Sequence, residues 1–183
     1  MNRRQLLANT GVALGALVAT NNAALAALRA QADSTPNADD KPDIVLADYS
    51  PEEALYLGAL FTWLELLKAT IDELYVSIDA LEAEPDSMDA KAAILMHLGV
   101  WSHLRVDTQK FDAPGVFATT HPHVTDTFRE LGHAADVIST GVVVESPTAV
   151  TLGTAHIEAA AEHVGQLIGS LPFNRPTRSE VLG

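Results

Sequence analysis

The stretch that decides the fold spans residues 50–81 and reads SPEEALYLGALFTWLELLKATIDELYVSIDAL. Its apolar side chains recur at alternating spacings of three and four, which predicts a long amphipathic helix with one continuous buried stripe. Ser50, Pro51 and Glu53 have the types and spacing of a capped helix start. A helix of this length, about 45 Å at 1.5 Å per residue, needs apolar partners along all of it. The stripe comprises Leu57, Leu60, Leu64, Leu67, Ile71, Leu74, Ile78 and Leu81.

Three later segments supply those partners. Amphipathic helices are predicted over residues 87–110, 120–141 and 146–171, where apolar residues again recur with helical spacing. Small polar residues suited to N-caps precede these segments, and Gly or Pro lies near their ends. Four helices with mostly short connections favour an all-α fold, an up-down-up-down four-helix bundle over residues 50–172.

Composition narrows the range of functions. The chain has 183 residues, 48% of them hydrophobic, and no cysteine. One packed core is therefore expected, while disulfides, thiolate nucleophiles and Cys-based zinc sites are excluded. The sequence also lacks a G-x-S-x-G and an H-E-x-x-H motif. A non-catalytic protein is accordingly favoured over an enzyme.

The chain is strongly acidic. Its formal net charge is −13, and the three arginines of residues 1–32 leave 8 Lys and Arg against 24 Asp and Glu, or −16, in the remainder. Phosphate backbones and anionic lipid headgroups repel such a protein. Binding to nucleic acid is therefore not expected.

The first 32 residues have the features of a targeting segment. Arg3 and Arg4 precede a weakly hydrophobic Gly/Ala/Leu/Val stretch, and residues 30–32, Ala-Gln-Ala, form a small-residue cleavage signal. With its arginine pair followed by Leu6 and Leu7, this leader resembles a twin-arginine (Tat) signal peptide. The resemblance covers the leader alone. It implies a prokaryotic protein that the Tat machinery exports folded to the periplasm or beyond.

The leader also sets the expected domain boundaries. Residues 1–32 are predicted to be removed, leaving an Asp- and Pro-rich tether at 33–49 before the bundle and a polar tail at 173–183. An ordinary Sec signal and a retained anchor are the alternatives. A stable transmembrane anchor is least favoured because Asn21 and Asn22 interrupt an apolar run that is already short for a span.

His97 is the candidate cofactor-binding residue. At 100° per residue it lies near the centre of the apolar face of the second helix, with Ile94, Trp101 and Leu104. A largely buried ring is therefore predicted there. We favour a hydrogen-bonded structural role over ligation of haem or another cofactor.

His156 and His163 are the candidate metal ligands. They share a flank of the last helix but stand two turns, about 10 Å, apart, too far to bind one ion without other ligands. Glu65 and Asp72 on one flank of the 50–81 helix are the carboxylates proposed to complete such a site. Interhelical polar contacts and an intrahelical salt-bridge ladder are the favoured alternatives.

Glu130 and His133 form the only Glu-x-x-His motif of the kind found in di-iron bundles. The helical phase places the pair opposite the stripe made by Val124, Phe128 and Leu131. A solvent-exposed pair is therefore predicted instead of a metal site.

These observations support two hypotheses. The first is an exported, non-catalytic four-helix bundle that binds an unidentified ligand or protein partner, or contributes to the cell envelope. The alternative is a metal- or haem-binding bundle that uses His97, or His156 and His163 with carboxylates of the first helix. No cofactor is required by the sequence.

Overall fold

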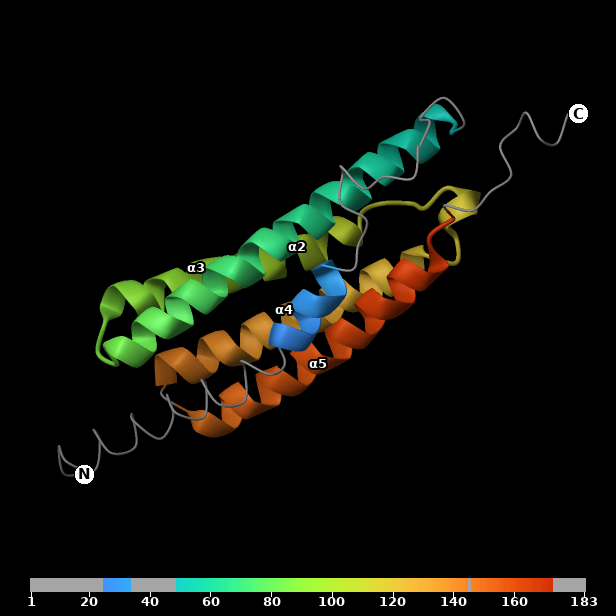
Figure 1. Ribbon diagram of the computed structural model, residues 1–183. Helices are drawn as coiled ribbons and strands as arrows, with labels where there is room; N and C mark the ends of the chain where they lie inside the picture. The colour runs from blue at the N-terminus through green and yellow to red at the C-terminus, as the bar shows by residue number, and fades with distance from the viewer. Residues whose placement is uncertain (1–24, 34–48, 145, 173–183) are drawn as a thin grey trace, which may run out of the picture.

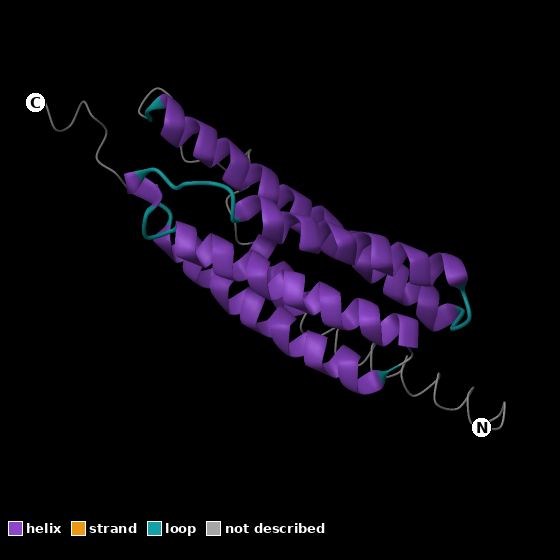
Figure 2. Cartoon of the chain, turned by 180° about the vertical axis from the view of Figure 1, so that it is seen from behind, coloured by secondary structure: helices purple, strands orange, loops and turns teal. Residues whose placement is uncertain are grey.

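The computed structural model describes residues 25–33, 49–144 and 146–172, and within these ranges the chain is all-helical, without strands, as predicted (Figures 1 and 2). Most of the leader, most of the tether and the polar tail lie outside the described residues. A 3₁₀ turn, η2 (Gly115–Phe117), precedes the third long helix. The four long helices are α2 (Pro51–Ala83), α3 (Met88–Thr108), α4 (His121–Val144) and α5 (Pro147–Ser170).

The predicted helix starts are confirmed at three positions. Ser50 accepts a hydrogen bond from the Glu53 backbone N–H, and the Glu53 carboxylate accepts one from the Ser50 N–H, which completes a capping box. Ser87 and Ser146 cap α3 and α5 through their hydroxyl groups. These hydroxyls accept from N–H groups that have no partner within the helix.

Two local details differ from the prediction. Helix α4 continues past Gly141 to Val144, and the Gly141 carbonyl then accepts a hydrogen bond from the Ser146 N–H. Thr120 was expected to cap α4, but its hydroxyl donates to the Ser170 carbonyl at 2.9 Å. The side chain therefore links the start of α4 to the end of α5.

The stripe of α2 forms the centre of the core. All eight of its predicted residues are buried, from Leu57 to Leu81. Trp101 of α3 packs beside it and donates its indole N–H to the Thr70 hydroxyl at 2.9 Å, so its polar atom is satisfied. Among the described helices, residues 51–81 alone are long and apolar enough to cross a membrane. A core helix has the same composition, and the buried stripe explains it here.

The long helices lie in two pairs (Figure 1). A short turn joins α2 to α3, which lie side by side, and a second short turn joins α4 to α5 (Figure 2). Arg105 of α3 forms an ion pair with Asp136 of α4, with Nη1 and Oδ2 2.9 Å apart. The second pair carries the cluster of polar side chains described below.

A further helical segment, residues 25–33, packs against the long helices. Leu25, Leu28 and Ala32 are buried in the common core. Four helices therefore do not account for the whole described chain. The predicted boundary between leader and tether, after Ala32, falls within this packed segment.

The predicted burial of His97 is met only in part, because the residue lies half-buried at the edge of the core and not at the centre of the buried face. The buried stripe of α3 passes through the neighbouring Leu98 instead, continuing from Ile94 to Trp101. Adjacent residues in a helix differ by 100°, so a small change in helix rotation exchanges them between core and edge. Packing against α2 and α4 places the apolar residue inside.

Candidate metal centre

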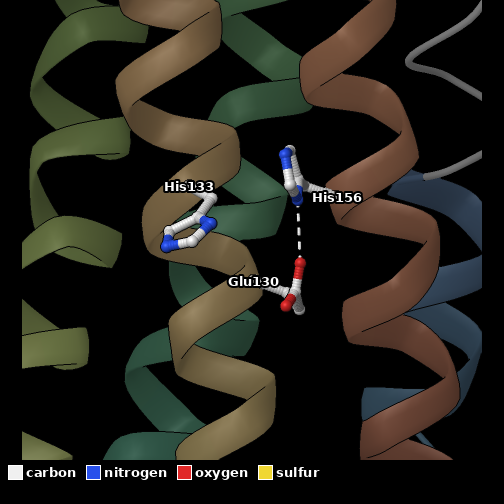
Figure 3. A group of neighbouring side chains, drawn as sticks. All are labelled: Glu130, His133 and His156. Atoms are coloured by element: carbon white, nitrogen blue, oxygen red, sulfur yellow. Dashed lines mark hydrogen bonds and ion pairs between the residues drawn. The ribbon is translucent and has the colours of Figure 1, made fainter.

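Three potential metal ligands converge on the interface between α4 and α5. Glu130 and His133 stand one turn apart on α4, and His156 faces them from α5 (Figure 3). One ligand atom from each residue lies within 4.8 Å of the other two. Among the described residues, no other three His, Asp or Glu side chains bring their ligand atoms within this distance of one another.

A glycine on α5 allows this convergence. A Cβ atom at Gly153 would overlap the Ile138 side chain and would lie 3.3 Å from the Ala134 carbonyl oxygen. The backbones of the two helices therefore approach more closely than a larger residue would permit. Gly153 and His156 share a face of α5, one turn apart. Close packing at the glycine thus places the imidazole against α4.

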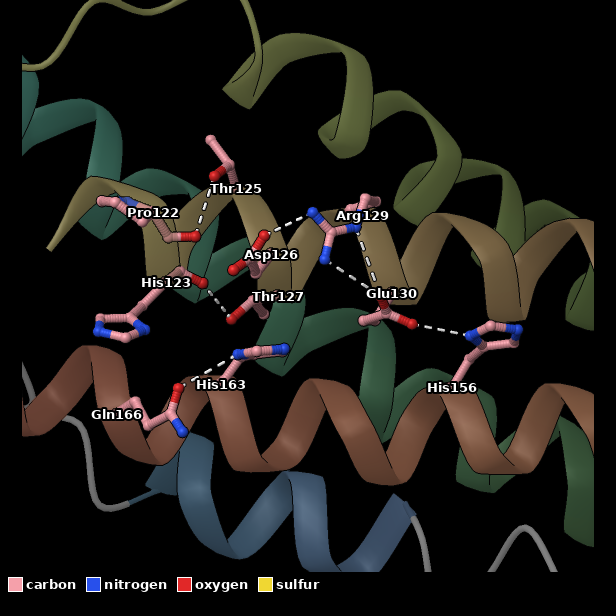
Figure 4. Close-up of polar contacts among 10 residues, drawn as sticks. All are labelled: Pro122, His123, Thr125, Asp126, Thr127, Arg129, Glu130, His156, His163 and Gln166. Atoms are coloured by element: carbon pink, nitrogen blue, oxygen red, sulfur yellow. Dashed lines mark hydrogen bonds and ion pairs between the residues drawn. The ribbon is translucent and has the colours of Figure 1, made fainter.

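Glu130 connects the two helices. Its Oε2 lies 2.8 Å from His156 Nδ1, and its side chain is only 17% exposed. Since an ionised carboxylate only accepts, the imidazole Nδ1–H is the donor. On the other side, Arg129 Nη2 lies 3.4 Å from Glu130 Oε1, and Arg129 also pairs with Asp126 (Figure 4). These contacts orient both carboxylate oxygens.

The pKa of Glu130 is lowered from its ordinary value. Burial acts in the opposite direction, but the hydrogen bonds and positive charges supplied by His156 and Arg129 outweigh it. A depressed carboxyl pKa keeps Glu130 ionised in mildly acidic solution. The ionised form is the one that binds a metal cation.

His133 lies at the open side of the cluster. Its side chain is exposed, and its ring meets that of His156 edge to face, with centroids 5.4 Å apart. A tetrahedral zinc ion, with bonds of about 2 Å, holds its ligand atoms about 3.4 Å apart. Zinc binding therefore requires a small rearrangement of the three ligand atoms, and His133, as the exposed member, is the side chain with room to move.

Two imidazoles and one carboxylate form a ligand set typical of zinc sites with one coordination position open to water. The same set also suits other divalent transition metals, whose affinities for such ligands rise from manganese to copper and are lower again for zinc. Arg129 and Asp126 would act outside the ligands by fixing the carboxylate. Without metal, the same residues make an interhelical His–Glu hydrogen bond, as expected for His156.

The other predicted site residues lie elsewhere. The His163 Nδ1–H donates to Gln166 Oε1 at 3.3 Å along α5 (Figure 4). Glu65 is exposed on α2, and Asp72 forms an ion pair with Arg29. His97 makes no hydrogen bond or ion pair to another described residue. Of the residues proposed from the sequence, the structure brings His156 alone into the cluster.

Glu130 and His133 were predicted to form a solvent-exposed pair, and for Glu130 this is wrong. The prediction assumed that α4 buries one narrow stripe. Helix α4 packs against both α3 and α5, so its buried arc also includes Thr127, Ala134 and Gly141. Glu130 borders this additional arc. Two features of the sequence could have indicated this site: the Glu-x-x-His spacing and the small residues on one face of the last helix.

Comparisons with known proteins add no assignment to this geometry. No protein-family model, curated protein sequence or solved structure matches the chain. The proposal below therefore depends on the residues themselves.

Proposed function

We propose that this chain is an exported four-helix-bundle protein that binds a divalent transition-metal ion, zinc in the first instance, between α4 and α5. The convergence of Glu130, His133 and His156 within 4.8 Å carries the metal assignment. The short connections between paired helices support the up-down-up-down arrangement. The Tat-like leader supports export into the periplasm or beyond.

Saturable zinc binding by the untagged full-length protein is the expected result. His156→Ala should lower the zinc affinity more than about tenfold, because losing a ligand costs at least as much as losing a group that only orients one. Isothermal titration with ZnCl₂ measures this loss. His163→Ala is the matched control, since its side chain lies on the same helix, also half-buried, but bonds to Gln166.

Zinc should also raise the melting temperature of the wild type. A ligand at about 100 times its Kd adds about 2.7 kcal/mol of stability, an increase in Tm of at least about 5 °C for a chain of this size. The affinity should fall as the solution becomes more acidic, because imidazole and carboxylate groups bind zinc only in their deprotonated forms. Equal zinc affinities for wild type and His156→Ala would refute the site.

The export proposal has a separate test. Arg3→Lys combined with Arg4→Lys should trap the precursor in the cytoplasm, because Tat recognition distinguishes guanidinium from ammonium whereas a Sec signal needs positive charge alone. Cell fractionation followed by immunoblotting measures the distribution. A double variant that reaches the periplasm as efficiently as wild type would rule out Tat routing.

A further inference from the structure

Residues 25–33 have the pattern of a helix made to fit this core. Leu25, Leu28 and Ala32 follow at spacings of three and four, and each is at most 2% exposed. Ala26 and Ala27 between them are exposed. The segment therefore has one buried face and one solvent face, as an amphipathic surface helix does.

The buried face reaches the centre of the molecule. Leu25 lines a small apolar cavity together with side chains from all four long helices. Gln31 lies over α5, where a Cβ atom on Gly165 would be 3.3 Å from its Oε1. The segment thus contacts both α2, through its ion pairs with Asp72 and Lys68, and α5 (Figure 1), and its buried side chains define a groove between these helices. The cavity residues besides Leu25 are Leu74, Ile78, Ile94, Leu98, Trp101, Ile138 and Ile157.

Charges on the segment match charges on α2. Arg29 Nη2 lies 3.0 Å from Asp72 Oδ1, and the guanidinium carbon lies 5.8 Å from the centroid of the Tyr75 ring. Asp33 Oδ1 lies 3.1 Å from Lys68 Nζ. Half-exposed ion pairs contribute little to stability, but alternating charges on facing helices fix their register. The contacts therefore specify one docked position.

Docking also protects the bond after Ala32, at which cleavage of the leader was expected. Residues 30–33 are helical, the Ala32 side chain is buried, and Asp33 is tied to Lys68. A protease acts on backbone that has locally unfolded, so its rate follows the population of the open state. Cleavage there requires the segment to leave its groove first.

We propose that the groove between α2 and α5 is a helix-binding site whose occupant is residues 25–33, and that the exported protein keeps this segment docked. The inference rests on the proposed export but is independent of the metal centre. It implies that the N-terminus of the exported protein lies at or before Leu25.

Two measurements test the proposal. Intact-mass analysis of protein recovered after native export locates its N-terminus. An N-terminus at or before Leu25 supports the proposal, and any later one overturns it. If no protein is exported, the export proposal fails, and the second measurement decides whether the segment is docked.

The second measurement uses the full chain purified from the cytoplasm and follows tryptic cleavage after Arg29. Leu28→Asp places a charge where the docked segment buries an apolar side chain, and so it favours undocking. Cleavage should accelerate at least about tenfold, because undocking exposes the bond after Arg29. Ala27→Asp, on the exposed face of the same segment, should leave the rate within about twofold of wild type. Equal rates in all three proteins would overturn the proposal.

Asp72→Lys provides a variant that leaves the core intact. Asp72 is half-exposed, so the substitution preserves the packing and instead places a cation against Arg29. Cleavage after Arg29 should accelerate about threefold or more, with far-ultraviolet circular dichroism unchanged. An unchanged cleavage rate in this folded variant would overturn the docked position that the Arg29–Asp72 ion pair is proposed to specify.

Discussion

Ile71→Ala should lower the free energy of unfolding by about 2–5 kcal/mol, because it removes buried methyl and methylene groups and leaves a cavity that the surroundings fill only in part. Ile71 is fully buried in the middle of the α2 stripe. Such a loss is a large share of the stability of a typical domain. Urea denaturation followed by circular dichroism measures the change.

Glu73→Ala is the control for this experiment. It shortens a side chain two positions away on the exposed face of the same helix, and should change the free energy of unfolding by less than about 0.5 kcal/mol. Alanine also favours helix slightly, so the control tests burial instead of helix propensity. Comparable losses in the two variants would show that α2 does not bury the stripe assigned to it.

The α2 stripe could be predicted from the sequence because its periodicity is unbroken and agrees with its caps. Every one of its a/d positions is apolar, and Ser50 and Glu53 fix the start independently. Helix α3 is different, since His97 and Leu98 are adjacent and either orientation gives a plausible face. Tertiary packing decides between them, and that information is not contained in the segment itself.

The candidate metal centre could not be predicted from the spacing of residues within single helices, for a related reason. The Glu130–His133 spacing was visible in the sequence, as was the position of His156 beside the α5 stripe. Their convergence depends on the two faces that α4 buries and on how closely α5 approaches it. Both are properties of helix pairs, so periodicity within one helix does not report them.

Residues 25–33 show a second kind of ambiguity. A run of Ala and Leu with one arginine suits the end of an export leader and equally suits a short amphipathic helix. Arg29 lies three residues before the cleavage point predicted after Ala32. In the structure the same side chain pairs with Asp72. The composition of the segment fits both an export leader and an amphipathic helix. Its contacts with α2 distinguish the two.

Gly153→Leu should destabilise the protein and weaken zinc binding together, because both depend on the close approach of α4 and α5. The first added atom would already overlap the Ile138 side chain, and the backbone at Ala134 limits how far the leucine can move. Overpacking of this kind costs about 1–3 kcal/mol. Separating the helices also moves His156 away from Glu130, so the zinc affinity should fall more than about tenfold.

Gly99→Leu is the matched control for this variant. Gly99 is exposed in the interior of α3, and no heavy atom of a neighbouring element lies within 4 Å of a Cβ atom placed there. The same substitution should therefore raise the free energy of unfolding, by up to about 1 kcal/mol, since leucine favours helix over glycine. Chemical denaturation and zinc titration of the two variants separate steric from propensity effects. A Gly153→Leu protein that loses stability yet binds zinc like wild type would show that the ligands do not depend on the helix spacing. If instead Gly153→Leu loses both stability and zinc affinity, while Gly99→Leu gains stability and keeps its zinc affinity, the packing of α4 and α5 is connected directly to the metal centre.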